Sequence, residues 1–220
     1  MQRSFSALIF DMDGVLVDSE PLHYAAEKEL HKQLGITVPK SLFHEFVGLS
    51  LTKMWERLKK EYSLRDSVDD LVEHDINFRG GFFAGQKSIP LIPGIKTLLE
   101  RLKASHIPIT IASSSSPNII DITLQKSGLD VFFDHYISGQ DVTHGKPAPD
   151  IYLKAAELLN IDPASCLVIE DARNGIIAAK EAGMFCIGFK SINSGNQDLS
   201  IADKVVEAID AGEILSLFEL

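Results

Sequence analysis

The chain has 220 residues, of which 45% are hydrophobic and 24% are charged, and its formal net charge at pH 7 is -10. This composition is typical of a globular protein with one core, or with a core that carries a smaller inserted unit. The excess of acidic residues opposes binding to nucleic acid or to an anionic membrane, because both are negatively charged. Any anionic substrate must therefore be met by local cations.

The apolar runs and the cysteines of the sequence indicate the cellular compartment in which the protein is expected. No apolar run is long enough to span a membrane, and the residues before the first acids lack the apolar region of a signal peptide. Cys166 and Cys186 lie in apolar runs and are expected to be buried, so we predict neither a disulfide framework nor a thiolate metal cluster. We expect a cytoplasmic protein, and we find no signal in the sequence for its oligomeric state.

The first predicted strand, Ala7–Phe10, is followed at once by two acids. Asp11 and Asp13 stand two residues apart, so their side chains point to the same side of an extended chain. Two like charges about 4 Å apart repel by about 4 kcal/mol at an effective dielectric constant of about 20. A cation or a shared proton must offset this repulsion, and we expect Asp13 to hold the proton. The simpler interpretation is a strand end followed by an Asp13-Gly14 turn.

The next 75 or so residues are predicted to contain helices and no strand. We expect these helices to form a cap domain, residues 16–88, inserted into a core domain made of residues 1–15 and 89–220. The cap would be hinged near Val15–Ser19 and Ser88–Pro93. The apolar spacing predicts cap helices at Pro21–Leu34, Ser41–Val47, Leu51–Tyr62 and Ser67–Phe83.

Beyond residue 90, apolar runs alternate with helical patterns. Most of the runs show little period-two alternation, which is typical of strands buried on both faces. Alternating strands and helices predict an α/β fold, with a Rossmann-like parallel sheet covered by helices. The predicted strands are Ile107–Ala112, Phe133–Ile137, Cys166–Ile169 and Phe185–Phe189, and the predicted helices are Pro93–Ala104, a helix from Pro117, Pro149–Leu159 and Asn174–Ala182.

Polar residues follow several of these strands. Ligands bind at the carboxyl ends of the strands in an open parallel sheet, so these residues are candidates for one site. Taken singly, each has a structural explanation: a loop serine, a loop lysine or a helix-capping acid, and Ser116 is expected to cap the helix from Pro117. The candidates are Asp11, Asp13, Ser113, Ser114, Lys146, Glu170 and Asp171.

Charge counting links the candidates. Four clustered acids and a phosphate ester would repel one another strongly unless a divalent cation and Lys146 were present. Carboxylate oxygens and open water positions favour Mg²⁺ among the divalent cations.

Four segments in this order, DMDGVLVDSE, IASSSS, GKPAPD and VIEDARNG, resemble the motifs of the haloacid dehalogenase superfamily. The resemblance is to the phosphatase branch that carries a helical cap after the first motif, and it extends to about residue 190. It implies a hydrolase of small phosphorylated metabolites, with sugar phosphates as the expected substrates. Asp13 argues against a dehalogenase, because dehalogenases of this superfamily typically lack the second acid of the first motif.

The resemblance also implies roles for the candidates. Asp11 would be the nucleophile that forms an aspartyl-phosphate, and Asp13 would be the general acid and base. Ser113 and the backbone amide of Ser114 would bind phosphoryl oxygens, and Lys146 would neutralise the transferring group.

The implied cofactor is Mg²⁺. It would be held by Asp11, by the main-chain carbonyl of Asp13 and by Asp171, with Glu170 as a direct or water-mediated ligand. In DSEPLH, the residues Glu20 and His23 would lie near the cap hinge and face the site.

Two alternatives remain open at this point. A β-phosphoglucomutase would carry a cap arginine one residue after a Gly-x-Ser, but Leu51 occupies that position in VGLSLTK. Lys53 would substitute for the arginine only if the helix were rotated. The non-enzymatic alternative is a receiver-like switch, which also uses acids, a lysine and Mg²⁺ on a parallel sheet. Receivers lack a helical cap, and their phosphorylated acid follows a later strand.

Overall fold

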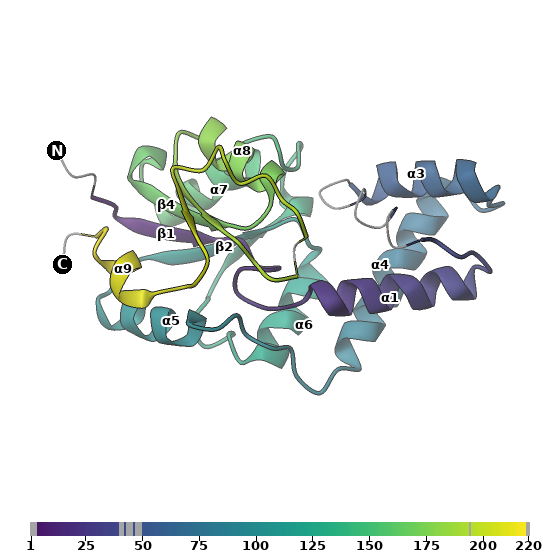
Figure 1. Cartoon of the computed structure of the whole chain (residues 1–220), viewed down its shortest axis with the longest axis horizontal. Helices are drawn as coiled ribbons and strands as arrows, with labels where there is room; N and C mark the ends of the chain where they lie inside the picture. The colour runs from purple at the N-terminus through teal and green to yellow at the C-terminus, as the bar shows by residue number, and fades with distance from the viewer. Residues whose placement is uncertain (1–3, 40–41, 43–45, 47–49, 194, 219–220) are drawn as a thin grey trace.

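The computed structural model describes residues 4–39, 42, 46, 50–193 and 195–218. A sheet covered by helices forms one part of the molecule, and a group of helices forms the other (Figure 1). The first and last described segments of the chain meet in a bridge between Phe5 and Phe218, at the end of the sheet that is remote from this helical group. Within the described residues, no helix combines the length and the apolar character needed to cross a membrane.

The sheet has six parallel strands in the order β3-β2-β1-β4-β5-β6. The first strand of the chain, β1, therefore lies inside the sheet, between β2 and β4. This arrangement confirms the predicted α/β fold class. The strands are β1 (Ala7–Phe10), β2 (Ile109–Ser113), β3 (Tyr136–Ser138), β4 (Cys166–Glu170), β5 (Phe185–Phe189) and β6 (Lys204–Val206).

Helices cover both faces of the sheet. Alternate residues of β1 show the division, because Leu8 and Phe10 pack into one apolar cluster while Ala7 and Ile9 pack into another. Since both faces are buried, β1 contains apolar residues throughout. One face is covered by α5 (Ile95–Ala104), α6 (Pro117–Ser127) and α9 (Ala211–Leu215), and the other by α7 (Asp150–Leu159) and α8 (Arg173–Glu181) (Figure 1).

In the described part of the chain, three helices lie between β1 and α5: α1 (Glu20–Gln33), α3 (Leu51–Tyr62) and α4 (Val68–Ala84). We call them the helical insert. They share a separate apolar cluster that includes Leu30 and the fully buried Trp55. The helix predicted at Ser41–Val47 lies outside the described residues, apart from positions 42 and 46. The helical insert agrees in place with the predicted cap, but the division into two domains stays a prediction.

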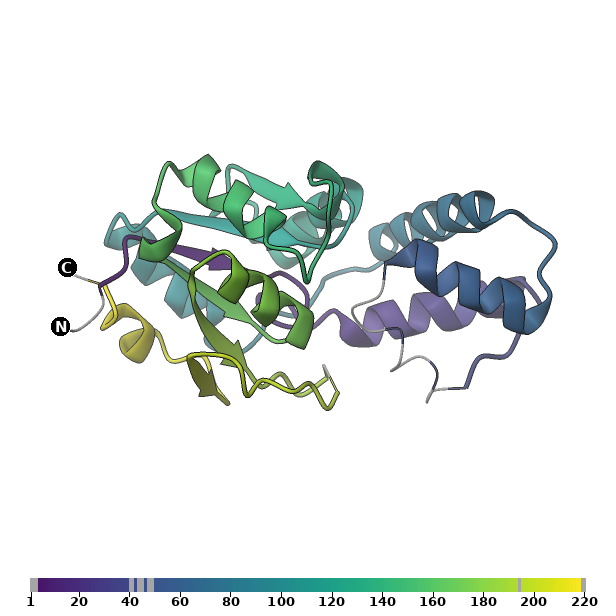
Figure 2. The same cartoon turned by 90° about the horizontal axis from the view of Figure 1, so that it is seen from above.

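The two connections between the sheet and the helical insert run side by side. Val17 and Leu91 form an antiparallel bridge. The amide of Asp18 donates to the carbonyl of Pro90 at 2.9 Å, and that of Ile92 donates to the carbonyl of Leu16 at 3.0 Å. The predicted hinges are therefore hydrogen-bonded to each other, although cap motion itself stays a prediction. Figure 2 shows the carboxyl ends of the strands directed toward the helical insert.

Candidate active site

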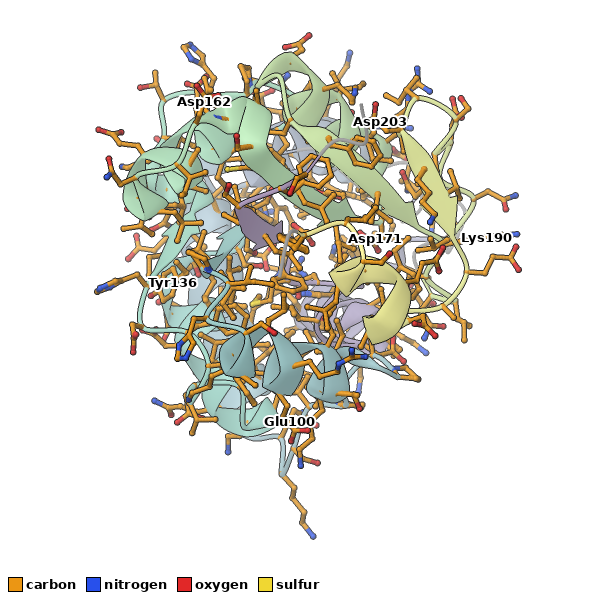
Figure 3. All side chains as sticks on the ribbon, turned by 90° about the vertical axis from the view of Figure 1, so that its left-hand side faces the viewer. Glu100, Tyr136, Asp162, Asp171, Lys190 and Asp203 are labelled. Atoms are coloured by element: carbon orange, nitrogen blue, oxygen red, sulfur yellow. The ribbon has the colours of Figure 1, made fainter. Side chains whose placement is uncertain are left out.

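The candidate acids lie where the parallel strands end. Asp11 directly follows β1, Glu170 is the last residue of β4, and Asp171 comes next in the chain. All three side chains are buried. In the view of Figure 3, Glu100 and Lys190 lie at the rim of the outline, whereas Asp171 lies within it. Because the three acids are buried, their charge is costly unless it is compensated.

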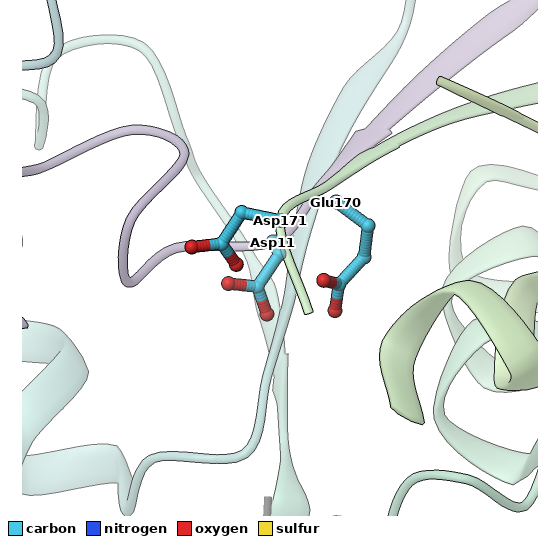
Figure 4. Close-up of side chains that lie close together, drawn as sticks. All are labelled: Asp11, Glu170 and Asp171. Atoms are coloured by element: carbon cyan, nitrogen blue, oxygen red, sulfur yellow. The ribbon is translucent and has the colours of Figure 1, made fainter. Parts of the chain in front are cut away.

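These three acids form a cluster that can hold a cation. One carboxylate oxygen from each of Asp11, Glu170 and Asp171 lies within 4.8 Å of the others (Figure 4). Burial raises the pKa of Asp11 to about 8; Glu170 and Asp13 add to the effect, whereas Lys146 opposes it. The raised pKa therefore reflects first the burial of this carboxylate, which contact with Lys146 does not offset. The donor set consists of hard oxygen ligands, which suits Mg²⁺.

Lys146 reaches into this cluster from the loop before α7. Its Nζ donates to Asp11 Oδ1 at 2.5 Å and to Glu170 Oε1 at 2.7 Å. The side chain is only 7% exposed. Burial alone would lower the pKa of Lys146, but the charges of Asp11 and Glu170 raise it above its ordinary value. Lys146 therefore remains a cation in contact with the predicted nucleophile.

The carboxylate of Glu170 is held on several sides. Its Oε2 accepts the backbone N–H of Ala172 at 2.8 Å, and its Oε1 accepts from Lys146 and, at 3.2 Å, from the Tyr152 hydroxyl. It also lies directly against the backbone of Gly175, where a Cβ atom would come within 1.6 Å of Oε1. A glycine at this position in α8 is therefore required by the placement of Glu170.

Three side chains donate to Asp13. Ser19 Oγ lies 2.5 Å from Asp13 Oδ1, Ser115 Oγ lies 2.9 Å from Oδ2, and His23 Nε2 lies 3.1 Å from Oδ1. Burial favours the protonated acid, but the charge of His23 and the three hydrogen bonds outweigh it and lower the pKa of Asp13 to about 2. The structure therefore differs from the expectation that Asp13 holds a proton, because these donors stabilise the ionised carboxylate. Asp11 is the acid whose pKa is raised.

The predicted phosphate-binding serines differ in their surroundings. Ser113 is buried at the end of β2, and its Oγ accepts the backbone N–H of Ser115 at 3.1 Å. Ser114 is exposed. Ser116 occupies the N-cap position of α6, but its side chain accepts no capping hydrogen bond. The structure thus places Ser113 and Ser114 at the same edge of the sheet as the acids.

The helical insert contributes Glu20 and His23 from the first turn of α1. Burial by itself would lower the pKa of His23, but contact with Asp13 raises it, and the ring packs against Phe83 of α4 at 4.8 Å between centroids. Burial raises the pKa of Glu20, and the charge of His23 opposes this rise. Arg79 of α4 also acts on both residues, and its positive charge lowers the pKa of each.

Sequence reasoning missed several residues around the site. Ser19 and Ser115 were part of the quoted motifs, but hydroxyls are too common in loops to reveal Asp13 as their acceptor. Asp75 and Arg79 are four residues apart on α4, which is the spacing of a helical ion pair. The sequence therefore contained a signal for this ion pair. The second contact of Arg79, with Glu27 of α1, could not be predicted in the same way, because it depends on how two helices pack.

The fold and the cluster define a class of α/β enzymes that bring an acid, a lysine and a cation-binding site to one sheet edge. A family model for the haloacid dehalogenase-like hydrolases matches residues 5–183. The chain belongs to this family. Its membership confirms the resemblance seen in the sequence and the prediction of a hydrolytic enzyme.

Relatives with named activities match most of the chain. The phosphorylated carbohydrates phosphatase of Thermotoga maritima is 31% identical over 81% of this chain and 82% of its own length. The β-phosphoglucomutase of Bacillus subtilis is 33% identical over 83% and 82%, respectively. Among solved structures, β-phosphoglucomutase from Clostridium difficile superposes with a TM-score of 0.82 at 28% identity, covering 97% of this chain and 96% of that one.

Proposed function

We propose that this protein is a Mg²⁺-dependent hydrolase of small phosphomonoesters, acting through an aspartyl-phosphate. The observation that carries the proposal is the contact between Asp11 and Lys146 within the acid cluster. This contact places a carboxylate oxygen and a cation together at the edge where ligands of parallel sheets bind. Receiver-like switching is disfavoured, because Asp11 follows the first strand and a helical insert separates it from the second.

In the first step, a carboxylate oxygen of Asp11 attacks phosphorus, and the bond from phosphorus to the leaving oxygen breaks. Lys146 contacts the nucleophile and neutralises charge on the transferring group. The backbone amide of Ser114 and the Ser113 hydroxyl orient its oxygens. When bound by Asp11, Asp171 and the carbonyl of Asp13, with Glu170 in support, Mg²⁺ would supply charge stabilisation at the phosphoryl oxygens.

Asp13 moves the protons in this proposal. As a general acid it must carry a proton to the leaving oxygen, and as a general base it then takes a proton from the water that hydrolyses the aspartyl-phosphate. In the described state, Asp13 is instead ionised and bound by Ser19, Ser115 and His23. Catalysis therefore requires Asp13 to release a partner in exchange for the substrate's leaving oxygen. A movement of the helical insert would withdraw His23, which lies on α1, whereas Ser115 belongs to the loop after β2.

Sugar phosphates are the substrate class that we favour. The Thermotoga maritima relative named for phosphorylated carbohydrates supports this choice. Glu20 and His23 would then contact the hydroxyl-bearing part of the substrate from the first turn of α1. The Bacillus subtilis mutase is an equally similar relative, so a mutase is the second candidate. Leu51 at the start of α3 stands against it, because it cannot bind a second phosphate, and Lys53 is exposed on the same helix.

The first test is phosphate release from a panel of sugar phosphates and p-nitrophenyl phosphate, with Mg²⁺ or with EDTA. We expect metal-dependent release that falls by at least about 1000-fold in Asp11→Asn, because the amide is a poor nucleophile. Asp134→Asn changes an exposed acid just before β3, at the opposite end of the sheet, and should retain full activity. Full activity of Asp11→Asn would refute the nucleophile. Isomerised hexose phosphate in excess of released phosphate would identify a mutase.

A further inference from the structure

Tyr152 is a buried residue of α7 that the mechanism above does not use. Its side chain is fully buried, and its hydroxyl donates to Glu170 Oε1 at 3.2 Å. The Lys146 ammonium lies 5.0 Å from the centre of its ring, which is within the range of a cation–π contact. Tyr152 therefore touches both members of the ion pair that supports the predicted nucleophile.

We propose that Tyr152 is a positioning residue, which fixes Lys146 on Asp11 by holding Glu170 with its hydroxyl and the ammonium with its ring. The proposal rests on the function proposed above, because it assigns Tyr152 a part in the same site. Tyr152 does not reach the reacting atoms in this scheme. It acts through Glu170 and Lys146.

The geometry of Glu170 gives the first reason. A carboxylate between two donors on one oxygen and a backbone N–H on the other has little freedom to rotate, since rotation would break several hydrogen bonds at once. The backbone of Gly175 leaves no space behind it. Removal of the Tyr152 hydroxyl would leave Oε1 with Lys146 alone, and one hydrogen bond fewer would then oppose rotation of the carboxylate.

The length of the lysine side chain gives the second reason. A lysine has four rotatable side-chain bonds and a compact ammonium group, so a single carboxylate does not fix its position. Lys146 enters from an exposed loop, yet its ammonium is held at 2.5 Å from Asp11 Oδ1 and 2.7 Å from Glu170 Oε1. The Tyr152 ring covers the ammonium and limits its exposure to water. The ring thus acts on the ammonium directly, and the hydroxyl acts on it through Glu170.

The test uses two substitutions at Tyr152 and a matched control. Tyr152→Phe keeps the ring and removes the hydroxyl, while Tyr152→Leu removes both. Tyr136→Phe removes another tyrosine hydroxyl that donates to a carboxylate, that of Asp121 at 2.9 Å, away from the acid cluster. We expect kcat to fall about tenfold in Tyr152→Phe and further in Tyr152→Leu, with KM changed less than about twofold. Tyr136→Phe should keep both constants.

A second readout is independent of catalysis. An ammonium held by two carboxylates exchanges its protons slowly, so Lys146 should give a lysine ammonium signal in ¹H–¹⁵N NMR spectra of the full chain. Lys146→Arg identifies the signal by its loss. We expect the signal to broaden or vanish in Tyr152→Phe and to persist in Tyr136→Phe.

Each outcome decides the proposal. An absent wild-type signal, or a signal unchanged in Tyr152→Phe, would overturn the positioning of Lys146. A lost signal with unchanged kcat would show that the positioning has no catalytic role and would also overturn the proposal. If the wild type released no phosphate from any substrate, the proposed function would fail, and the ammonium signal would decide the role of Tyr152 by itself.

Discussion

At the scale of single residues, the site depends on one close approach between a side chain and a backbone. A Cβ atom at Gly175 would lie 1.6 Å from Glu170 Oε1, so Gly175→Ala must displace Glu170 or α8. We expect a loss of about 1–3 kcal/mol in the free energy of unfolding, together with reduced turnover, because Lys146 loses a fixed partner. Urea unfolding and steady-state kinetics measure the two effects.

A second helical glycine provides the control for this substitution. A Cβ atom at Gly81 of α4 would have no neighbour within 4 Å. Gly81→Ala should therefore raise the free energy of unfolding by about 0.5–1 kcal/mol, since alanine favours the helix. Equal stability of Gly175→Ala and the wild type would contradict the placement of Glu170.

The residues of the site differ in how far the sequence reveals them. Sequence patterns reveal the residues at the ends of buried strands and in the loops beyond them, because the topology of a parallel sheet brings such residues together. These are Asp11, Lys146, Glu170 and Asp171. The state of Asp13 could not be derived in this way. It depends on Ser115, which is 102 positions away in the chain, and on His23 from the helical insert.

At the scale of elements, the helical insert contains a buried histidine that should make its stability depend on pH. His31 of α1 packs edge-on against Trp55 of α3, and its Nε2 has no hydrogen-bond partner among the described residues. Burial lowers the pKa of His31 to about 4, whereas the charge of Asp75 opposes this shift and that of Arg79 adds to it. Glu27 also faces the ring, with Oε1 at 3.8 Å from Nε2.

The direction of the pH dependence follows from the protonation of His31 in the folded and in the unfolded chain. Between a pKa of about 6.5 in the unfolded chain and about 4 in the folded one, only unfolded His31 binds a proton. Stability is therefore lost as the pH falls through this window, by about 2 kcal/mol at pH 5. His31→Phe should remove this part of the difference in unfolding free energy between pH 7 and pH 5. His74→Gln, which changes an exposed histidine of α4, should retain it. An unchanged difference in His31→Phe would refute a neutral, buried His31.

Apolar periodicity predicted the strands and helices of the interior and failed at the edges of the sheet. Ile9 and Val168 lie on buried strands whose composition alone identifies them. The strand β6 was missed because Lys204–Val206 is short and contains an exposed Val205. The third strand was predicted at Phe133–Ile137, whereas β3 begins at Tyr136. Phe133 is buried before the strand begins, because its ring packs edge-on against Phe10.

At the scale of the whole molecule, Mg²⁺ can stabilise the folded chain in two ways: by screening the net charge of -10, or by binding to the acid cluster. Any salt screens the repulsion among the excess negative charges. If NaCl is adjusted so that samples with and without Mg²⁺ have the same ionic strength, this general screening no longer contributes to a difference in stability between them. A specific site binds Mg²⁺ in the folded state only and stabilises it further with each increase in Mg²⁺ concentration. A comparison at constant ionic strength therefore separates the two effects.

We expect Mg²⁺ at about 100 times its dissociation constant to stabilise the wild type by about 2.7 kcal/mol. For a chain of this size, that corresponds to a rise in Tm on the order of 5–10 °C. Asp171→Asn should lose most of this rise, because it removes a carboxylate from the cluster. The exposed-acid variant Asp134→Asn should show the full rise. The same rise in both variants at constant ionic strength would place the cation elsewhere than at Asp11, Glu170 and Asp171.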